Sequence, residues 1–116
     1  MNSSTFKSKE ITELIVNWLK NYADTAHVKG FVVGISGGID SALTSTLCAM
    51  TGLPTLCVEM PIHQAASHVS RAQEHILYLK SKFSNVSNEI ADLTATFDLM
   101  AENLPKGDDT VKLNLT

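Results

Sequence analysis

The sequence predicts a three-layer α/β fold built on a parallel sheet, and three observations lead to that prediction. Apolar runs of strand length alternate with longer segments that have helical periodicity. Glycine or proline residues separate most of these segments. The first apolar run is nearly continuous, which is typical of a parallel strand covered on both faces. An alternating order of strands and helices gives a parallel sheet with right-handed crossovers.

The first expected element is an amphipathic helix from about Ser8 to Ala23. Its apolar residues recur at intervals of three and four, which places them on one face. That face either packs on the core of the domain, which the sequence favours, or forms a subunit interface, where Trp and Tyr are enriched. The face consists of Ile11, Leu14, Ile15, Trp18, Leu19 and Tyr22.

The first strand is expected at Phe31–Ile35, and a helix from about Ser41 to Thr51 follows it. Gly52 suits the position after a helix, and Pro54 prevents the helix from continuing. Three apolar residues about one turn apart are expected to face the sheet: Leu43, Leu47 and Met50.

The second half of the chain repeats this order. Its expected elements are a strand at Thr55–Met60, a helix from about Ser67 to Ser81, a weak strand at Val86–Ile90, and a helix capped by Asp92 that stops at Pro105. The apolar stripe of the helix near residues 67–81 contains Val69, Ala72, Ile76 and Leu79.

The most informative segment is the turn Gly34–Ser41, with the sequence Gly-Ile-Ser-Gly-Gly-Ile-Asp-Ser. It joins a strand to a helix N-terminus, where unpaired backbone N–H groups and the positive end of the helix dipole attract anions. Gly37 and Gly38 have no Cβ atom that would keep a phosphate away from those N–H groups. Ser36 and Ser41 add hydroxyl groups. The segment therefore predicts a phosphate site at the carboxyl end of the first strand.

A carboxylate in the same turn, Asp40, predicts a cation beside the phosphate. Mg²⁺ accepts one or two carboxylates together with phosphate oxygens and water, so it fits this position. The turn lacks the G-x-G-x-x-G pattern of dinucleotide folds and the lysine of a Walker A loop. A glycine turn capped by serine, with no ligand, is the simpler alternative.

Length and composition limit the other possibilities. The 116 residues suffice for one small domain, and the net charge of −3 argues against a broad nucleic-acid surface. No apolar run approaches the ~20 residues needed to cross a bilayer, and no signal peptide is evident at the start of the sequence. Cys48 and Cys57 lie in apolar segments without metal-binding spacing. Two buried, reduced thiols in a cytoplasmic protein are therefore expected.

The motif S-G-G-x-D-S resembles the pyrophosphate loop of the N-type ATP pyrophosphatases, and more narrowly that of the NAD synthetases. Three features are similar to the latter: Ile-Val-Asn-Trp-Leu at 15–19, the phrase Lys29–Leu43, and Met60-Pro61 after the second strand. The resemblance implies a Rossmann-like topology of the adenine nucleotide alpha hydrolase-like type. It also implies that residues 1–116 are the N-terminal part of a single, truncated ATP-pyrophosphatase domain.

Carried over by position, the resemblance implies ligands for each part of the loop. ATP would contact Gly34, Ile35, Ser36, Gly37, Gly38, Ile39, Asp40, Ser41 and, at the adenine, Met60, while Asp40 would hold Mg²⁺. The implied reaction joins ammonia to the nicotinate carboxylate of deamido-NAD, after ATP has adenylylated that carboxylate. The family also implies a homodimer. No catalytic acid, base or nucleophile is assigned in the chain, and of its histidines only His63 lies near a strand end.

Two departures from the family and two alternatives remain open. Glu59 stands where some members have a basic residue, which weakens the adenine-side assignment. The larger departure is length, because the family's chains are considerably longer and their later segments supply phosphate-binding and deamido-NAD-binding residues. Lys29 lies at the wrong end of its strand to replace a loop lysine. We therefore expect the 116-residue chain alone to be inactive. The thirty or so residues before the loop favour ammonia over glutamine as nitrogen donor, unless another chain hydrolyses glutamine. The alternatives are another pyrophosphate-loop ligase, such as a tRNA-modifying enzyme, and an inactive nucleotide-binding or dimerising fragment.

Overall fold

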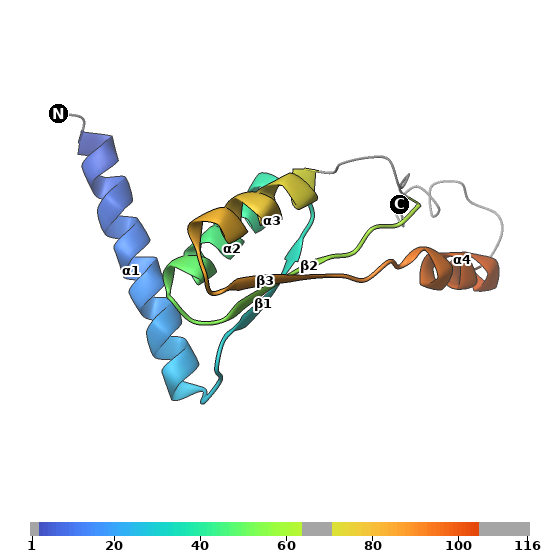
Figure 1. The fold of residues 1–116 in the computed structure, drawn as a ribbon, viewed down its shortest axis with the longest axis horizontal. Coiled ribbons are helices and arrows are strands. Elements are labelled where there is room, and N and C mark those ends of the chain that lie inside the picture. The colour runs from blue at the N-terminus through green and yellow to red at the C-terminus, as the bar shows by residue number, and fades with distance from the viewer. Residues whose placement is uncertain (1–2, 64–70, 105–116) are drawn as a thin grey trace.

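The computed structural model describes residues 3–63 and 71–104 of the chain, with side chains from residue 7 onward. Helices and strands alternate along it as the sequence predicts (Figure 1). The elements are α1 (Ser3–Thr25), β1 (Phe31–Ile35), α2 (Ile39–Met50), β2 (Thr55–Glu59), α3 (Arg71–Lys82), β3 (Val86–Ile90) and α4 (Thr94–Asn103). Val69 and the expected start of α3 near Ser67 lie outside the described residues.

The three strands form one parallel sheet in the order β1-β2-β3. Their carboxyl ends are in register, because Ile35 pairs with Glu59 and Glu59 pairs with Ile90. The expected α/β fold with a parallel sheet is therefore confirmed. The loop after each strand consequently begins at the same edge of the sheet, where ligands bind in open parallel sheets.

Helices α2 and α3 lie together on one face of the sheet (Figure 1). Strand residues that point toward them are buried, as Val33 and Cys57 are. Residues on the opposite face are more open, and Val32 is 72% exposed. Of the three predicted layers, the described residues therefore supply the sheet and one helical layer. Among the described residues β1 is an outer strand of that sheet with one face open, whereas its apolar sequence predicts a central strand covered on both faces.

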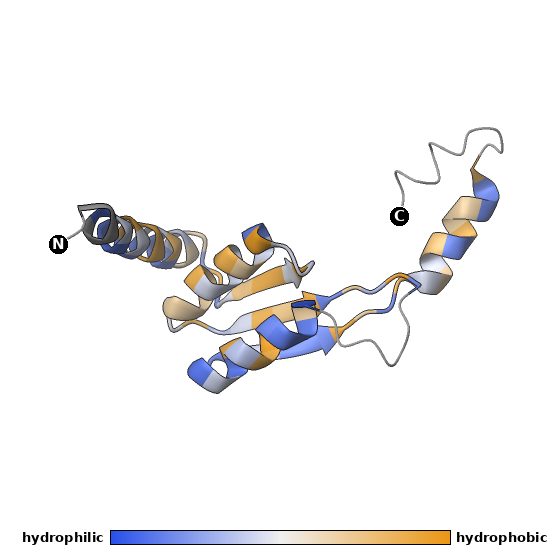
Figure 2. Cartoon of the chain, turned by 90° about the horizontal axis from the view of Figure 1, so that it is seen from above, coloured by the Kyte–Doolittle hydropathy of each residue, from blue (hydrophilic) through white to orange (hydrophobic). Residues whose placement is uncertain are grey.

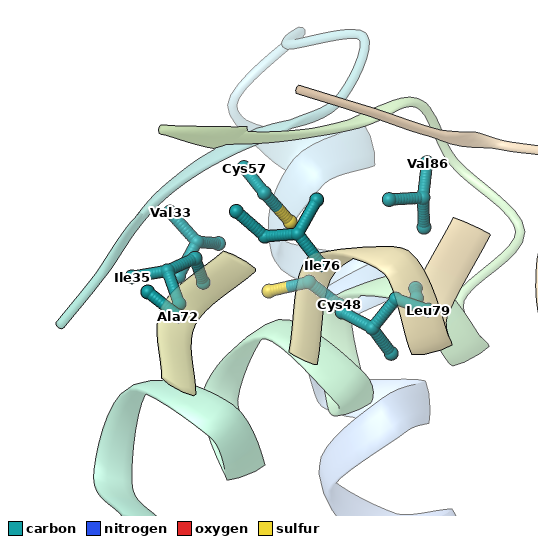
Figure 3. Packing of buried hydrophobic residues seen from close by; sticks show 9 residues of the cluster. Val33, Ile35, Cys48, Cys57, Ala72, Ile76, Leu79 and Val86 are labelled. Carbon is teal, nitrogen blue, oxygen red and sulfur yellow. The ribbon is translucent and has the colours of Figure 1, made fainter. Parts of the chain in front are cut away.

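The core lies between the sheet and the two helices, and Figure 3 shows its side chains converging there. Helix α3 contributes the apolar stripe that its sequence predicts. Helix α2 does not, because Leu43 is 59% and Met50 is 42% exposed. Its small side chains face the sheet instead and permit a close approach. The core contains Val33, Ile35, Cys48, Ala49, Cys57, Ala72, Ile76, Leu79 and Val86.

Helix α1 packs on α2 through Val16, Leu19 and Ala23. Its N-terminal half projects away from the sheet in both views (Figures 1 and 2). Most of the predicted apolar face is open: Leu14 is 69% and Trp18 is 60% exposed. The favoured prediction, that this face packs on the domain's own core, is therefore wrong for the described part of the chain.

Helix α4 lies beyond the carboxyl ends of β2 and β3, apart from the core (Figures 1 and 2). It has no buried residue. The Asp92 carboxylate accepts a hydrogen bond from the Thr94 N–H at 2.9 Å. The N-cap residue is Leu93, however, and no described side chain caps the helix, so the predicted cap at Asp92 is wrong by one residue. The hydrogen bonds with Thr94 keep the pKa of Asp92 below its usual value. Among the described helices, none has the length and apolar character of a transmembrane span.

Candidate functional site

The predicted phosphate loop connects the end of β1 to the start of α2. Gly38 is the N-cap residue, with φ −85° and ψ 166°, and the helix begins at Ile39, two residues earlier than expected. The first hydrogen bond of the helix runs from the Ala42 N–H to the Gly38 carbonyl at 3.2 Å. The backbone N–H groups of residues 39–41 therefore precede the helical hydrogen bonds, and no described side chain caps them.

The two loop serines hold the loop in shape. The Ser41 hydroxyl accepts a hydrogen bond from the Ser36 N–H at 3.1 Å, and the two hydroxyl oxygens are themselves 3.1 Å apart. Ser36 Oγ accepts from the Gly38 N–H at 3.3 Å, and Ser41 Oγ donates to the Gly38 carbonyl at 3.3 Å. Both hydroxyls thus form hydrogen bonds within the loop. The network fixes the direction of the open N–H groups.

The fold requires glycine at one position of the loop, Gly37, but not at the next, Gly38. Gly37 has φ +89°, a conformation that L-residues rarely adopt. Gly38 has an ordinary backbone, and a Cβ atom there would meet only Ser36 Oγ, at 3.4 Å. The protein's own packing therefore does not require glycine at position 38. Because Gly38 is the N-cap residue, a Cβ atom there would stand at the helix N-terminus, where an anion would approach the N–H groups.

Asp40 lies in the first turn of α2 with an exposed side chain. A carboxylate in this position stabilises the helix through the dipole, even without a metal. Among the described residues, no group of three or more His, Cys, Asp or Glu side chains is placed to hold a metal ion. Asp40 therefore fits Mg²⁺ only as one protein ligand beside phosphate oxygens and water, which is the mode that Mg²⁺ favours at nucleotide sites.

The end of β2 forms a second wall of the site. The Met60 side chain lies over β1, because a Cβ atom at Gly34 would be 3.1 Å from Met60 Cε. Gly34 and Met60 are both open to solvent, so together they offer a flat apolar surface near the loop. Glu59 is buried, 8% exposed, on the face that carries the helices. Its carboxylate therefore does not lie on the surface that Met60 forms.

The turn after β2 brings His63 to α4. The His63 N–H donates to Thr94 Oγ1 at 2.8 Å, and its Nε2 lies 2.7 Å from Asp98 Oδ1. The ring also meets Phe97 edge-on, with centroids 5.6 Å apart. His63 has φ +54° and so makes the sharp turn that these contacts need. His63 thus anchors α4, and the described contacts give it no place at the loop.

Two other polar groups belong to the core. Ser45 of α2 is fully buried, and its hydroxyl lies 2.9 Å from Nε2 of His75 on α3, which ties the two helices together. The thiols of Cys48 and Cys57 are buried and free, as expected (Figure 3). Burial raises the pKa of each thiol above its ordinary value of 9.0, so both stay protonated at neutral pH.

The sequence analysis missed one neighbour of the loop. A Cβ atom at Gly37 would lie 3.3 Å from Arg71 Cβ and 3.4 Å from the Ala72 backbone nitrogen. Helix α3 therefore begins its described part against the loop. A signal for this was available, because the loops after adjacent parallel strands meet at one edge of the sheet. A cationic residue distant from the loop in sequence, Arg71, therefore lies beside it in the fold.

Comparisons with known proteins give a consistent family. A family model described as NAD synthase matches residues 11–116. The NH(3)-dependent NAD(+) synthetase of Mycoplasmopsis pulmonis is 30% identical over 124 residues, covering 98% of this chain and 45% of the relative. The protein of the same name from Methanosarcina acetivorans is 31% identical over 101 residues, covering 85% of this chain and 38% of the relative.

Solved structures agree with these matches. The NH3-dependent NAD synthetase of Campylobacter jejuni has a TM-score of 0.73 at 26% identity, covering 91% of this chain and 44% of that one. The NMN synthetase of Francisella tularensis has a TM-score of 0.68 at 30% identity, covering 81% of this chain and 38% of that one. The chain thus spans less than half the length of the relatives named here.

Proposed function

The chain belongs to the NAD synthase family, and from that premise we propose that Gly34–Ser41 forms the ATP site of an amide-forming ligase. The observation that carries the proposal is the helix N-terminus left open at Gly38. Three uncapped N–H groups follow the N-cap, and the N-cap residue itself has no Cβ atom. Such N–H groups bind phosphate oxygens in a fixed direction and at no cost in reorganisation.

The proposed reaction converts deamido-NAD to NAD. A nicotinate carboxylate oxygen attacks the α-phosphorus of ATP, and the bond to the β-phosphate oxygen breaks, which releases pyrophosphate. Ammonia then attacks the carbonyl carbon of the acyl adenylate, AMP leaves with the former carboxylate oxygen, and a proton is released. The loop N–H groups hold the β- and γ-phosphates and stabilise the negative charge that builds on pyrophosphate. The flat surface at Met60 and Gly34 is the proposed contact for adenine.

Asp40 is the proposed protein ligand of Mg²⁺. When bound, Mg²⁺ neutralises phosphate charge as pyrophosphate departs. The carboxylate stands beside the open N–H groups, so a cation there is also needed to prevent repulsion between Asp40 and the phosphates.

Calorimetry with ATP tests the nucleotide and metal assignments together. Asp40→Asn keeps the shape of the side chain and removes its charge, so ATP affinity should fall with Mg²⁺ present and rise in a chelator, where the carboxylate only repels the phosphates. Asp24→Asn is the matched control, because Asp24 precedes β1 and lies at the other end of that strand. Failure of the wild-type chain to bind ATP would refute the proposed site, and an equal loss in both media would refute the metal role.

The similarity to an NMN synthetase supports a second acceptor for the same chemistry. That acceptor is the mononucleotide that carries a nicotinate carboxylate. Product analysis with each acceptor, using the intact gene product, ATP, Mg²⁺ and ammonium or glutamine, distinguishes the two acceptors and identifies the nitrogen donor. The tRNA-modifying alternative predicts that neither acceptor is amidated.

We also propose that two copies of the chain associate through the open face of α1. Trp18 and Tyr22 stack there with ring centroids 5.4 Å apart, and Trp18 is 60% and Tyr22 is 58% exposed. Leu14 and Ile11 continue the same face with 69% and 54% exposure. Exposed apolar residues gathered on one helix face mark interaction sites, and aromatic residues are enriched in the cores of such interfaces.

A further inference from the structure

A cationic side chain, that of Arg71, begins beside the loop and has no role in the ATP site proposed above. Arg71 is the only arginine in the chain. Its Cβ lies 3.3 Å from the position of a Cβ at Gly37, so the side chain starts directly beside the loop. The remaining cations of α3, Lys80 and Lys82, lie at the far end of that helix.

The guanidinium of Arg71 is available for a ligand. The side chain is exposed, and among the described residues it makes no ion pair or hydrogen bond. By contrast, Lys80 Nζ donates to Asn88 Oδ1 at 2.7 Å, and Lys82 Nζ lies 5.9 Å from the centroid of the Tyr78 ring. Among the described cations of α3, Arg71 is thus the one without a described partner.

The chemistry of the loop also needs a positive charge. Its open N–H groups contribute partial charges, and Asp40 adds a full negative charge on the same turn. Pyrophosphate brings several negative charges, of which one Mg²⁺ neutralises only two. An arginine presents two parallel N–H donors that match two phosphate oxygens, which a lysine does not.

We propose that Arg71 binds the β- and γ-phosphates of ATP, and afterwards the pyrophosphate, beside the loop. This inference rests on the proposed ATP site and assigns it a cation. Gly37 has a second role in it. Because this residue has no side chain, the backbone of α3 comes close to the loop and brings the Arg71 Cα–Cβ bond to its side.

Two variants separate the charge of Arg71 from its place in the fold. Arg71→Gln keeps much of the side-chain stem, and Arg71→Lys keeps the charge but loses the two parallel donors. Lys82→Gln is the matched control, because it removes one positive charge from the same helix. Calorimetry measures the binding of the probe, which is inorganic pyrophosphate with Mg²⁺. Arg71→Gln should weaken binding roughly 10- to 100-fold, the loss expected for a charge-assisted contact, and Arg71→Lys should weaken it less. Lys82→Gln should bind as wild type.

A second readout observes the guanidinium directly. Because the chain has one arginine, its Nε–H signal in a ¹H–¹⁵N spectrum needs no further assignment. The signal should shift on addition of pyrophosphate and stay unchanged on addition of adenosine, a result that a purely structural role would not give. Wild-type affinity in Arg71→Gln, or an Nε–H signal that pyrophosphate does not move, would overturn the role of Arg71 alone. A wild-type chain that binds no pyrophosphate would overturn both this role and the ATP site.

Discussion

Substitution of Gly38 by alanine should abolish phosphate binding while leaving the fold intact. The backbone of Gly38 has φ −85° and ψ 166°, which alanine adopts freely, and the new Cβ would meet only Ser36 Oγ at 3.4 Å. Alanine is a poorer N-cap residue than glycine and costs about 1 kcal/mol. Replacing glycine also restricts the unfolded chain, which returns about 0.4–1 kcal/mol. The net change in the free energy of unfolding is therefore about zero.

The effect on ATP binding should be large by comparison. The new methyl group occupies the approach to the open N–H groups of α2, so phosphate oxygens lose at least two charge-assisted hydrogen bonds. At about 1.5–3 kcal/mol each, that loss weakens ATP binding roughly 100-fold or more. Calorimetry measures the affinity, and thermal unfolding followed by circular dichroism measures the stability.

Two other glycines supply the controls. Gly37→Ala should destabilise the protein by about 1–2 kcal/mol, because φ is +89° and the new Cβ would lie only 3.3 Å from Arg71 Cβ. For a domain of this size that corresponds to a fall in Tm of roughly 4–16 °C. Gly52→Ala imposes a similar strain at φ +80°, with no atom within 4 Å, and should leave ATP binding unchanged. If Gly38→Ala bound ATP like wild type, or lost as much stability as Gly37→Ala, the reasoning about the loop would be refuted.

Three further predictions concern the rest of the chain. Trp18→Asp should shift the light-scattering mass from about twice 12.6 kDa to the single-chain value, because it places a charge in the open face of α1. Asn17→Asp, which lies outside that face, should leave the mass unchanged. A monomeric wild-type chain would contradict the proposed dimer. The free energy of unfolding should decline as pH rises above about 9.0. Burial raises the pKa of Cys48 and Cys57, so above this pH the folded state holds protons that the unfolded state releases. Urea titrations at several pH values measure the decline, which should shrink in a variant with both cysteines replaced by alanine. The 116-residue chain supplied with ATP, Mg²⁺, deamido-NAD and ammonium should form no NAD above background. The described residues bring one carboxylate and one arginine to the loop, whereas the departing pyrophosphate needs several fixed charges. Turnover measured by chromatography would contradict this prediction.

Strand positions were predictable from the sequence because local chemistry determines them. The bounds of β1 and β3 agree with the expected ones, and β2 ends one residue earlier, at Glu59. Apolar runs between turn residues mark buried strands, and Pro61 or a glycine break limits their length. The loop between β1 and α2 was predictable for the same reason, since its glycines and serines have few other uses at a strand end.

Packing partners were not predictable, because periodicity identifies an apolar face but not what covers it. The stripes of α1 and α2 have the spacing of core residues, yet Leu14 and Leu43 are exposed. In α2 the small residues Cys48 and Ala49 join the strand residues in the core, because small side chains let the helix come close to the sheet. The proximity of Gly37 and Arg71 depends on how two neighbouring strand–helix units pack together, which no local sequence pattern shows.

The order of the strands has a consequence for how the chain acquires its structure. Each strand pairs with the strand that follows it in the sequence, and no later segment inserts between β1 and β2. Once Glu59 has left the ribosome, both strands of the first pair and helix α2, which packs on them, have therefore already been synthesised. Contacts between near neighbours in the sequence form quickly, because little chain entropy is lost in closing them. The phosphate loop is enclosed within this earliest unit, so its shape can form during synthesis, before α3 brings Arg71 to its side.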